Sequence, residues 1–569
     1  MATPVSRLPR QGADAASERP RLGRMLKDLG LLTATQLEYA LQKQEVEQDR
    51  IGNILVGNGL VLEHDVAKVI AEQRGIPFVP ASDLPQPDAG VLALFNRELC
   101  LANRFLPWRK GERGLEVLLG DSDPEEIGRL VMQRCDLPAV FHQTENSRLI
   151  QQIRQCYYFA QNPVEKLVRR EIQLLASDVD NVATPARLLD HLLHFAIRER
   201  ATDIHIAPSA KSWHVLFRID GILRPMLAFP PALARLLTFV KINSQMDISE
   251  QRKPQDGSFH TVILDKPYTV RISTLVSEAG ERMVLRLLPE RGDMSGLLQL
   301  GYRKQDVSLL QRIFERPSGL VLITGPTGSG KSTTLHAALR MQSLIERNVL
   351  TVEDPVEYRV PGACQTEVNR RAGYDFGSAL RNFLRHDPDV MLIGEIRDGE
   401  TARAAVESAA TGHLVLSTLH VANVFGVIPR LRPFGLGAQE IADNLVAIIS
   451  QRLVRRVCPH CAQPQLFDQS TKEWLGEHHK GPGRMGAGCD ACRGTGYLGR
   501  VPVYEILQVS QAIVTAIVDE QGRETLLRTA RESGFQPMQE MARQLVADGQ
   551  TTHEEIVRVL GEAAAEHDA

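Results

Sequence analysis

The strongest chemical signal in the sequence is a glycine-rich stretch, Gly325–Thr333, which reads GPTGSGKST. It follows the apolar run Leu320–Thr324 and precedes Leu335–Leu339, so the pattern predicts a strand, a loop and the start of a helix. In such a loop the backbone surrounds phosphate oxygens, the lysine reaches the β- and γ-phosphates, and the serine holds Mg²⁺. A glycine-rich turn that fits by chance is the alternative, and the flanking strand and helix argue against it. The residues expected to contact the nucleotide are Gly325, Pro326, Thr327, Gly328, Ser329, Gly330, Lys331, Ser332 and Thr333.

Three further apolar runs, 349–352, 390–393 and 414–419, are flanked by side chains suited to nucleotide hydrolysis. Continuous apolar runs are typical of parallel strands that are buried on both faces. The acids that follow the first two runs are Glu353, Asp354, Glu357, Glu395 and Asp398. Carboxylates at the end of such a strand hold Mg²⁺ directly or through water, and a solvated strand end is the alternative. His413 and His420 lie at the two ends of the third run.

Four of the eight cysteines form two CxxC pairs separated by 27 residues (489 − 461 − 1). Two such pairs are typical of a closed tetrahedral Zn²⁺ site with four thiolate ligands. A thioredoxin-like redox pair is the alternative, although one CxxC pair would suffice for it. We therefore predict that zinc folds the segment 458–492. The predicted ligands are Cys458, Cys461, Cys489 and Cys492.

Length and composition limit the classes of protein to which these sites can belong. A chain of 569 residues with 43% hydrophobic residues predicts several globular domains. The net charge of −3 argues against general affinity for nucleic acid. No apolar run approaches the roughly 18 residues needed to span a bilayer, and the polar residues 1–20 carry no secretory signal. We expect a cytoplasmic protein with a flexible leader over residues 1–20.

Residues 21–44 and 50–73 are two copies of one motif at a period of 29 residues (50 − 21). Each copy predicts a short helix, a glycine turn and a second amphipathic helix, with Thr33 and Gln36 as a capping box in the first copy. Two stacked helical hairpins would explain the apolar positions, but polar surface positions need not repeat. The residues that pair between copies are Arg21 with Arg50, Leu37 with Val66, Leu41 with Ile70, and Gln44 with Gln73.

The region between the repeat and the glycine-rich loop predicts two further modules. Residues 75–158 suggest a small α/β unit with strands at 75–80 and 115–119, and the polar residues 159–184 suggest a linker. Alternating strands over 185–290, with tight turns at Asp220-Gly221 and Asp256-Gly257, suggest an antiparallel sheet. Any one arginine there is most simply a surface residue, but as a group they could neutralise a triphosphate. These arginines are Arg218, Arg224, Arg271, Arg282 and Arg286.

The order of the motifs GPTGSGKST, EDPVE, GEIRD and GHLVLSTLH resembles the secretion ATPase superfamily that powers type II secretion and type IV pilus assembly. The resemblance extends from residue 21 to about 560 and implies a multi-domain α/β protein. The expected domains are an N-terminal helical-repeat and α+β domain (21–158), a linker (159–184), a PAS-like α+β domain (185–290), and a RecA-like P-loop ATPase domain (291–569) that carries the zinc insertion 458–492.

The same resemblance implies roles for individual residues. Glu357 would polarise the attacking water, Glu395 would support Mg²⁺ together with Ser332, and His420 would sense the γ-phosphate. Arg271 and Arg286 match arginines that reach ATP from the preceding domain. The family usually reads PQDGR, whereas Ser258 follows Gly257 in this chain, which removes one basic contact.

The twin motif resembles the cyclic-di-GMP-binding N-terminal domain of some pilus and secretion ATPases. By this resemblance the first copy would contact one half of the ligand through Arg21, Leu37, Leu41 and Gln44. The second copy would contact the other half through Arg50, Val66, Ile70 and Gln73. Guanidinium groups suit phosphate or guanine edges, and aliphatic side chains suit flat purines.

The resemblance also implies partners and a place in the cell. It implies a homo-hexamer. The hexamer would act on an inner-membrane platform protein and on the cytoplasmic domain of an assembly-complex membrane protein. Through these partners the chain would be attached to the inner membrane peripherally. The tetracysteine insertion favours an assembly ATPase over a retraction ATPase. The alternatives are a nucleotide-gated scaffold or switch with weak ATPase activity, and a nucleic-acid translocase, which lacks support from charge or stacking motifs.

Overall fold

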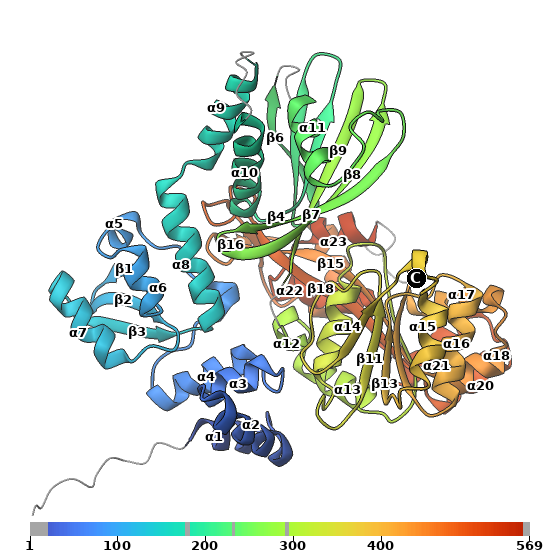
Figure 1. Ribbon diagram of the computed structural model, residues 1–569. Coiled ribbons are helices and arrows are strands. Elements are labelled where there is room, and N and C mark those ends of the chain that lie inside the picture. Colours follow the sequence, from blue (N-terminus) through green and yellow to red (C-terminus); the bar gives the residue numbers. More distant parts are fainter. Residues whose placement is uncertain (1–20, 177–182, 230–233, 291–294, 562–569) are drawn as a thin grey trace, which may run out of the picture.

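The computed structural model describes residues 21–176, 183–229, 234–290 and 295–561 as a set of packed α/β modules (Figure 1). The predicted leader 1–20 and residues 177–182 of the predicted linker lie outside these ranges. Within them, no helix combines the length and the apolar character that crossing a membrane requires. The multi-domain α/β class is confirmed.

The twin motif folds as two helical hairpins that pack into one unit, with α1 against α4 and α2 against α3. Its helices are α1 (Leu22–Asp28), α2 (Ala34–Glu47), α3 (Ile51–Gly57) and α4 (Glu63–Arg74). The predicted capping box is confirmed, since the Gln36 amide N–H donates to Thr33 Oγ1 at 3.1 Å and the Thr33 N–H donates to Gln36 Oε1 at 2.9 Å. Gly30 and Gly59 take the same left-handed backbone conformation after the first helix of each copy.

Residues 75–161 form a small α/β unit around a three-stranded sheet in the order β1-β2-β3. Its elements are α5 (Ala89–Leu92), α6 (Arg97–Ala102), β1 (Phe105–Gly111), β2 (Gly114–Leu119), α7 (Pro124–Cys135), β3 (Ala139–Gln143) and α8 (Asn146–Gln161). The predicted strand at 115–119 is confirmed. The predicted strand at 75–80 is wrong, because Pro77 and Pro80 lack the N–H groups of a ladder and only an isolated bridge joins Phe78 to Gln143.

The predicted linker 159–184 is wrong for the part that the structure describes. Residues Val164–Ala176 form helix α9, which packs against α10 (Ala183–Arg198). An apolar stripe at spacings of three and four residues makes this contact, although charged residues surround it in sequence. The buried residues of the stripe are Val164, Val168, Ile172 and Leu175.

A six-stranded antiparallel sheet follows, in the order β6-β5-β4-β9-β8-β7, as the alternating pattern predicted. Helices α9 and α10 contribute to the core on one face of this sheet. The elements are β4 (Ala201–Pro208), β5 (Trp213–Ile219), β6 (Ile222–Phe229), α11 (Ala234–Asn243), β7 (Gln255–Ile263), β8 (Lys266–Ser277) and β9 (Gly280–Pro289).

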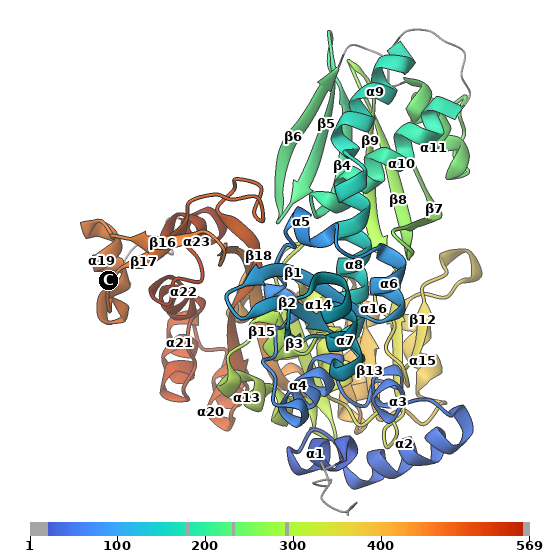
Figure 2. The ribbon, with the colours of Figure 1, turned by 90° about the vertical axis from the view of Figure 1, so that its left-hand side faces the viewer.

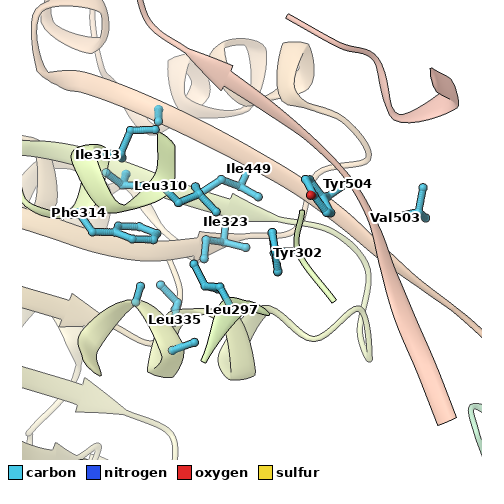
Figure 3. Packing of buried hydrophobic residues seen from close by; sticks show 14 of the residues in the cluster. Leu297, Tyr302, Leu310, Ile313, Phe314, Ile323, Leu335, Ile449, Val503 and Tyr504 are labelled. Carbon is cyan, nitrogen blue, oxygen red and sulfur yellow. The ribbon is translucent and has the colours of Figure 1, made fainter. Parts of the chain in front are cut away.

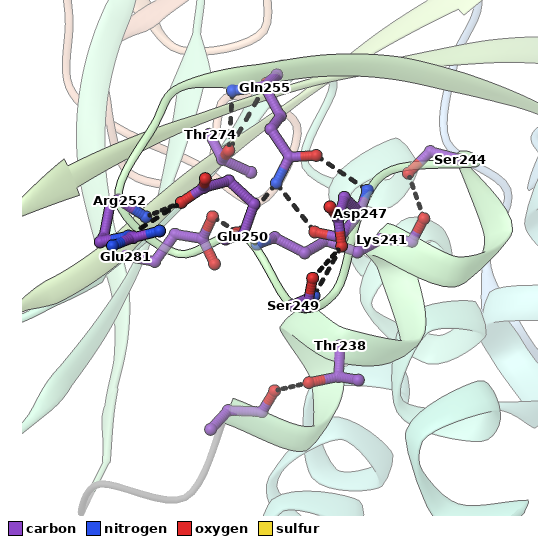
Figure 4. A network of polar contacts seen from close by, with 11 residues as sticks. Thr238, Lys241, Ser244, Asp247, Ser249, Glu250, Arg252, Gln255, Thr274 and Glu281 are labelled. Atoms are coloured by element: carbon purple, nitrogen blue, oxygen red, sulfur yellow. Dashed lines mark hydrogen bonds and ion pairs between the residues drawn. The ribbon is translucent and has the colours of Figure 1, made fainter.

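One of the two turns predicted in this sheet is confirmed and the other is wrong. Asp220-Gly221 joins β5 to β6 with positive φ at both residues. Asp256 and Gly257 lie inside β7, because the chain turns earlier, where Gln255 and Lys241 bind the preceding loop (Figure 4). A Cβ atom at Gly257 would come within 2.6 Å of the Ser244 carbonyl oxygen, so the close approach of this loop explains the glycine.

The glycine-rich loop belongs to a seven-stranded sheet in the order β12-β11-β13-β14-β10-β15-β18, in which β18 alone is antiparallel to its neighbour. Its strands are β10 (Gly319–Thr324), β11 (Val349–Glu353), β12 (Cys364–Glu367), β13 (Val390–Ile393), β14 (Leu414–Leu419), β15 (Leu445–Val457) and β18 (Tyr497–Gln508). The three apolar runs and the run before the loop are therefore buried parallel strands, as predicted.

Helices cover both faces of this sheet. Alternate residues of β10 enter two different cores, with Val321 and Ile323 in one and Leu320 and Leu322 in the other. Figure 3 shows the first core, where Tyr302 stacks on Tyr504 beside the strand. The helices are α12 (Leu297–Leu300), α13 (Lys304–Phe314), α14 (Lys331–Arg340), α15 (Phe376–Phe383), α16 (Gly399–Ala410), α17 (Val427–Leu431), α18 (Ala438–Asn444), α20 (Gln511–Val518), α21 (Arg523–Glu532), α22 (Met538–Ala547) and α23 (His553–Leu560).

The cysteine-bearing segment leaves the sheet after β15 and returns to it at β18. It contains β16 (Ala462–Gln465), α19 (Gln469–Leu475) and β17 (Gly483–Gly486), and β16 pairs with β17. Trp474 and Leu475 of α19 are buried in the first core of the large sheet. The segment is therefore anchored to the domain by its helix.

Candidate functional site

A cavity of about 980 Å³ lies where the glycine-rich loop meets the ends of β11, β13 and β14 and the six-stranded sheet. This volume is at the upper end of the usual range for small-molecule sites, roughly 300–1,000 Å³. The carboxyl ends of parallel strands are where ligands of open α/β sheets bind. Pro326 to Thr333 all line the cavity, whereas Gly325, the first residue of the loop, does not.

The backbone of the loop has the shape that a phosphate site requires. Gly325 and Gly330 have φ values of +146° and +87°, which residues other than glycine rarely adopt. A Cβ atom at Gly325 would come within 2.5 Å of the Gln451 carbonyl oxygen. Lys331 Nζ donates to the carbonyls of Gly325 at 3.0 Å and Pro326 at 3.1 Å, so the lysine lies folded over the loop.

The polar atoms of the loop fit a phosphate ligand. Ser329 Oγ is buried and has no hydrogen-bond partner within the described ranges. Buried hydroxyl groups are nearly always bonded, and a hydroxyl can donate to a phosphate oxygen. Burial lowers the pKa of Lys331, and the negative charges of Glu395 and Glu357 oppose that shift. The ammonium group is therefore desolvated and faces acids across the cavity.

Gln451 on β15 supports the loop from below, and the sequence reasoning missed it. This side chain is 1% exposed. Its Nε2 donates to the Ser329 carbonyl at 2.7 Å, and its Oε1 accepts from Tyr302 Oη at 2.6 Å and from Thr334 Oγ1 at 3.0 Å. No local motif marks a glutamine that lies 122 residues from its partner.

The structure distinguishes the acids that follow the strands. Glu353 is buried and accepts bonds from Thr351 Oγ1 at 2.9 Å and Gln365 Nε2 at 3.0 Å, with His336 Nε2 3.0 Å away. Glu357 is exposed and lines the cavity. A carboxylate that is already bonded to the protein is a poor general base, so the geometry favours Glu357 over Glu353.

Glu395 and His420 lie together at the cavity, as predicted from the ends of β13 and β14. His420 Nε2 is 3.3 Å from Glu395 Oε2, and Arg397 pairs with the other carboxylate oxygen. His413, at the opposite end of β14, does not line the cavity and contacts the Ser408 carbonyl at 2.9 Å through Nδ1. The carboxylate of Glu395 and the hydroxyl of Ser332 are oxygen donors of the kind that Mg²⁺ prefers.

The six-stranded sheet brings basic side chains to the same cavity. Arg286 of β9 and Arg218 of β5 line it, together with Asp203 of β4, which the sequence reasoning did not single out. Arg271 of β8 is next to Arg286 across the strands but does not line the cavity, so its contact with nucleotide stays a prediction. Four arginines of the P-loop domain that were also missed line the cavity, and they are Arg397, Arg452, Arg500 and Arg558.

The predicted residues of the twin motif occupy equivalent places in the two hairpins. Arg21 and Arg50 precede α1 and α3 with nearly the same backbone angles, and both are exposed. A Cβ atom at Gly23 would come within 2.7 Å of Leu37, and one at Gly52 within 3.4 Å of Val66, so each glycine lets the two helices of its copy approach.

The other residues of the twin motif differ in their exposure and partners. Leu41 is 48% exposed and its counterpart Ile70 is half-buried. Gln44 Nε2 donates to the Asp49 carbonyl, and Arg50 Nη1 donates to the Asp121 carbonyl, both at 2.9 Å. Gln73, the counterpart of Gln44, is half-buried near the end of α4. The repeat is structural symmetry, and ligand binding by it stays a prediction.

The four predicted zinc ligands converge on one point. Their sulfur atoms all lie within 4.8 Å of one another, with Cys458–Cys489 and Cys461–Cys492 separations of 3.8 Å. Four thiolates around Zn²⁺ at about 2.3 Å would be about 3.8 Å apart. His460 is exposed and is not part of the cluster.

Backbone N–H groups also point at the sulfur atoms. Those of Gly488, Cys489 and Gly496 donate to sulfur at 3.1 to 3.3 Å. Such bonds stabilise thiolates, so these residues fit a closed zinc site.

Comparisons with known proteins cover nearly the whole described chain. The family described as Type II/IV secretion system protein matches residues 178–558, and the MshEN domain matches residues 74–162. Type II secretion system protein E of Pectobacterium carotovorum subsp. carotovorum is 41% identical over 389 residues, which are 68% of this chain and 77% of that protein.

Two further comparisons concern a pilus ATPase and a solved structure. Type IV pilus assembly ATPase PilB of Thermus thermophilus is 36% identical over 537 residues, which are 90% of this chain and 59% of PilB. Among solved structures, the Legionella pneumophila ATPase DotB is similar at 22% identity with a TM-score of 0.49, over 64% of this chain and 93% of DotB.

Proposed function

Because this chain belongs to the type II/IV secretion system protein family, we propose that its phosphate-loop cavity hydrolyses ATP to drive assembly of a secretion pseudopilus or a type IV pilus. The single observation that carries this proposal is the cavity itself, where Lys331, Glu357, Glu395 and two arginines of the neighbouring sheet converge. A switch with weak turnover would not need a candidate base beside the loop, which Glu357 supplies.

Each residue has a role that follows from its position. The loop amides and Lys331 bind the β- and γ-phosphates, and Arg286 and Arg218 balance the charge that spreads over the γ-phosphate in the transition state. Glu357 orients and polarises the attacking water, and His420 lies beside Glu395 to contact the γ-phosphate. Bound Mg²⁺, held through Ser332 and Glu395, would supply charge neutralisation of the phosphates.

The roles of Lys331 and Glu357 are tested by measuring ATP binding and turnover separately. Lys331→Ala should abolish both, because it removes the cation of the loop. Glu357→Gln should lower kcat by about 100-fold or more, the usual range for loss of a general base, while the Kd for ATP changes less than about threefold. Glu407→Gln on the exposed face of α16 is the matched control and should keep full turnover. Normal hydrolysis by Glu357→Gln would contradict the assignment of the base.

The twin motif supports a regulatory ligand, which we propose to be cyclic di-GMP. A two-fold symmetric dinucleotide suits two equivalent hairpins, each with an arginine before its first helix. The MshEN match begins at residue 74, directly after the second copy. Titration of cyclic di-GMP should give a weaker Kd for Arg21→Ala and Arg50→Ala than for the unaltered protein. Equal affinity in all three proteins would contradict the site.

The assembly state and membrane partners belong to the same proposal. A homo-hexamer in the cytoplasm, attached to an inner-membrane platform protein and to the cytoplasmic domain of an assembly-complex membrane protein, would convert hydrolysis into extension of a filament. The supporting observation is the similarity to type II secretion protein E and PilB over the P-loop domain. Sedimentation of the full chain with ATP tests the ring, and a monomer at all concentrations would contradict it.

A further inference from the structure

A row of charged residues crosses the six-stranded sheet at a single register. Asp203 on the central strand β4 is the direct cross-strand partner of Arg218 on β5 and of Arg286 on β9. Arg286 in turn is opposite Arg271 on β8, and Arg271 is opposite Ser258 on β7. Directly paired residues of antiparallel strands point to the same face, so these side chains share one face.

This face is the one that turns away from the helices. The neighbours of Asp203 along β4 show the alternation, because Ile204 is buried in the core with α9 and α10. Asp203 itself, Arg218 and Arg286 line the cavity above the phosphate loop. The middle of the row therefore lies opposite Lys331.

Asp203 is the only acid of the row, and it is hydrogen-bonded to Arg286 and more loosely paired with Arg218. Its side chain is 5% exposed, and its Oδ1 accepts from Arg286 Nε at 2.8 Å. Its Oδ2 accepts from Thr202 Oγ1 at 2.7 Å and lies 3.8 Å from Arg218 Nε. Because Arg286 is bonded through Nε, its terminal amino groups are not used by the carboxylate.

The two arginines remain accessible at their far ends. Their side chains are 58% exposed for Arg286 and 39% exposed for Arg218, although the carboxylate between them is buried. Arg218 Nη1 donates to the Gly221 carbonyl at 3.1 Å, which fixes it further. Among the described residues, the terminal amino groups of Arg286 have no recorded partner, so they are available to an anion in the cavity.

The row carries an excess of positive charge. Three arginines and one aspartate give a net charge of +2 (3 − 1), and Arg286 and Arg271 are like charges directly opposite each other. Such a pair is destabilising in a sheet unless a negative group lies between or above the two cations. A triphosphate above Arg286 would supply that group.

We propose that Asp203 is a positioning residue for ATP hydrolysis, which holds Arg286 with its terminal amino groups aimed at the phosphates of a nucleotide in the loop. This inference rests on the proposed ATPase function. The buried carboxylate fixes the Nε side of the Arg286 guanidinium before the nucleotide arrives, so less side-chain freedom is lost when the transition state forms. An ion pair that only stabilises the sheet would have no effect specific to turnover.

A double-mutant cycle between Asp203 and Arg286 separates these two roles, with kcat, the Kd for ATP and the thermal midpoint measured on the full chain. Asp203→Asn keeps the size of the side chain and should lower kcat about tenfold. This decrease should be smaller than the decrease caused by removing an arginine that contacts the transferring phosphate. In an Arg286→Ala background the same change should lower kcat less than about twofold, because it acts through Arg286. The Kd for ATP should stay within about threefold.

Two variants complete the test. Glu278→Gln removes one acid from the exposed β8–β9 turn of the same sheet and should leave kcat unchanged. Arg286→Lys keeps the positive charge but has no Nε to bind Asp203, so its kcat should fall nearly as far as that of Arg286→Ala. Because the Arg286 side chain is half-exposed, Arg286→Lys should fold, so it tests the proposal even if Asp203→Asn does not fold.

Each outcome either supports or overturns the proposed role of Asp203. Full kcat in Asp203→Asn or in Arg286→Lys would overturn the inference, as would losses that multiply when Asp203→Asn and Arg286→Ala are combined. If the unaltered protein itself does not hydrolyse ATP, the proposed function falls instead, and the two failures are thereby distinguished.

Discussion

Gln451 connects the phosphate loop to the core through one buried side-chain amide. It bonds the Ser329 carbonyl, the Thr334 hydroxyl at the start of α14 and the Tyr302 hydroxyl, which is itself buried. Burial raises the pKa of Tyr302, so the phenol stays a donor at neutral pH. The conformation of the loop is therefore supported by a side chain that does not line the cavity.

Replacement of this amide should weaken nucleotide binding. Gln451→Met keeps the volume but leaves the three partners unsatisfied, which should lower the free energy of unfolding by about 2 kcal/mol. The Kd for ATP should rise about tenfold, since the loop is no longer pre-organised. Gln439→Met on the exposed surface of α18 is the control and should change neither value. An unchanged Kd for ATP in Gln451→Met would show that the glycines alone determine the conformation of the loop.

At the residue scale, the sequence predicted the sites whose members lie close together in the chain. The GPTGSGKST loop and the CxxC pairs are local patterns, and each fixes its own geometry within a few residues. Asp203 and Gln451 could not be found this way, because their roles depend on strand register over 83 and 122 residues. Only the pairing of β4 with β9, and of β15 with β10, brings them to the site.

At the scale of elements, the cysteine-bearing segment has little regular structure of its own around its four-cysteine cluster. Its two strands, β16 and β17, are four residues each, and such a short hairpin is marginal in water. Burial of Trp474 and Leu475 anchors α19 only. A metal that ties the two CxxC turns together would therefore contribute directly to the stability of this segment.

Zinc content and thermal stability test this dependence. The purified chain should contain one zinc per chain, and Cys489→Ser should lose it and lower the thermal midpoint by about 5 °C or more. Cys364→Ser, at an exposed cysteine of β12, is the control and should keep the metal. If Cys489→Ser retained both its zinc and its thermal midpoint, the four-thiolate site would be wrong, and a disulfide seen on non-reducing analysis would favour the redox alternative.

The elements that sequence reasoning missed show which patterns are ambiguous. The apolar stripe of α9 is carried by only four residues among charged neighbours, so its composition favoured a linker. Asp256-Gly257 has the composition of a tight turn, yet Gly257 is needed because the Ser244 carbonyl approaches it. In both cases tertiary packing overrides the local preference.

At the scale of the whole molecule, the twin-motif helices lie directly on the P-loop domain. Figures 1 and 2 both place α3 and α4 beside it. Ile345, between α14 and β11, packs into the core of the twin motif. A Cβ atom at Gly59 would lie 3.5 Å from the Pro361 carbonyl oxygen, and one at Gly296 would lie 2.7 Å from Leu62. Domain contacts of this kind have no local signature in sequence, and the structure alone reveals them.

These contacts flank the segment that carries Glu353 and Glu357. Ile345 precedes β11 and Pro361 follows Glu357, so a shift of the second hairpin would reach the acids from both sides. Coupling of two sites requires that the ligand favour one arrangement of the element between them. We expect the second hairpin to be that element, because it carries Arg50, Val66 and Ile70 and because its Gly59 and Leu62 contact the P-loop domain.

Cyclic di-GMP should therefore change the ATPase rate of the full chain by at least about twofold, a modest coupling free energy. Arg50→Ala should lose both the binding and the response. Ile345→Ala should keep the Kd for cyclic di-GMP but lose most of the response, because it removes the packing through which the hairpin reaches β11. Val262→Ala, at an exposed position of β7, is the matched control and should respond normally. A full response in Ile345→Ala would exclude this contact as the route, and a missing response in the unaltered protein would exclude regulation by this ligand.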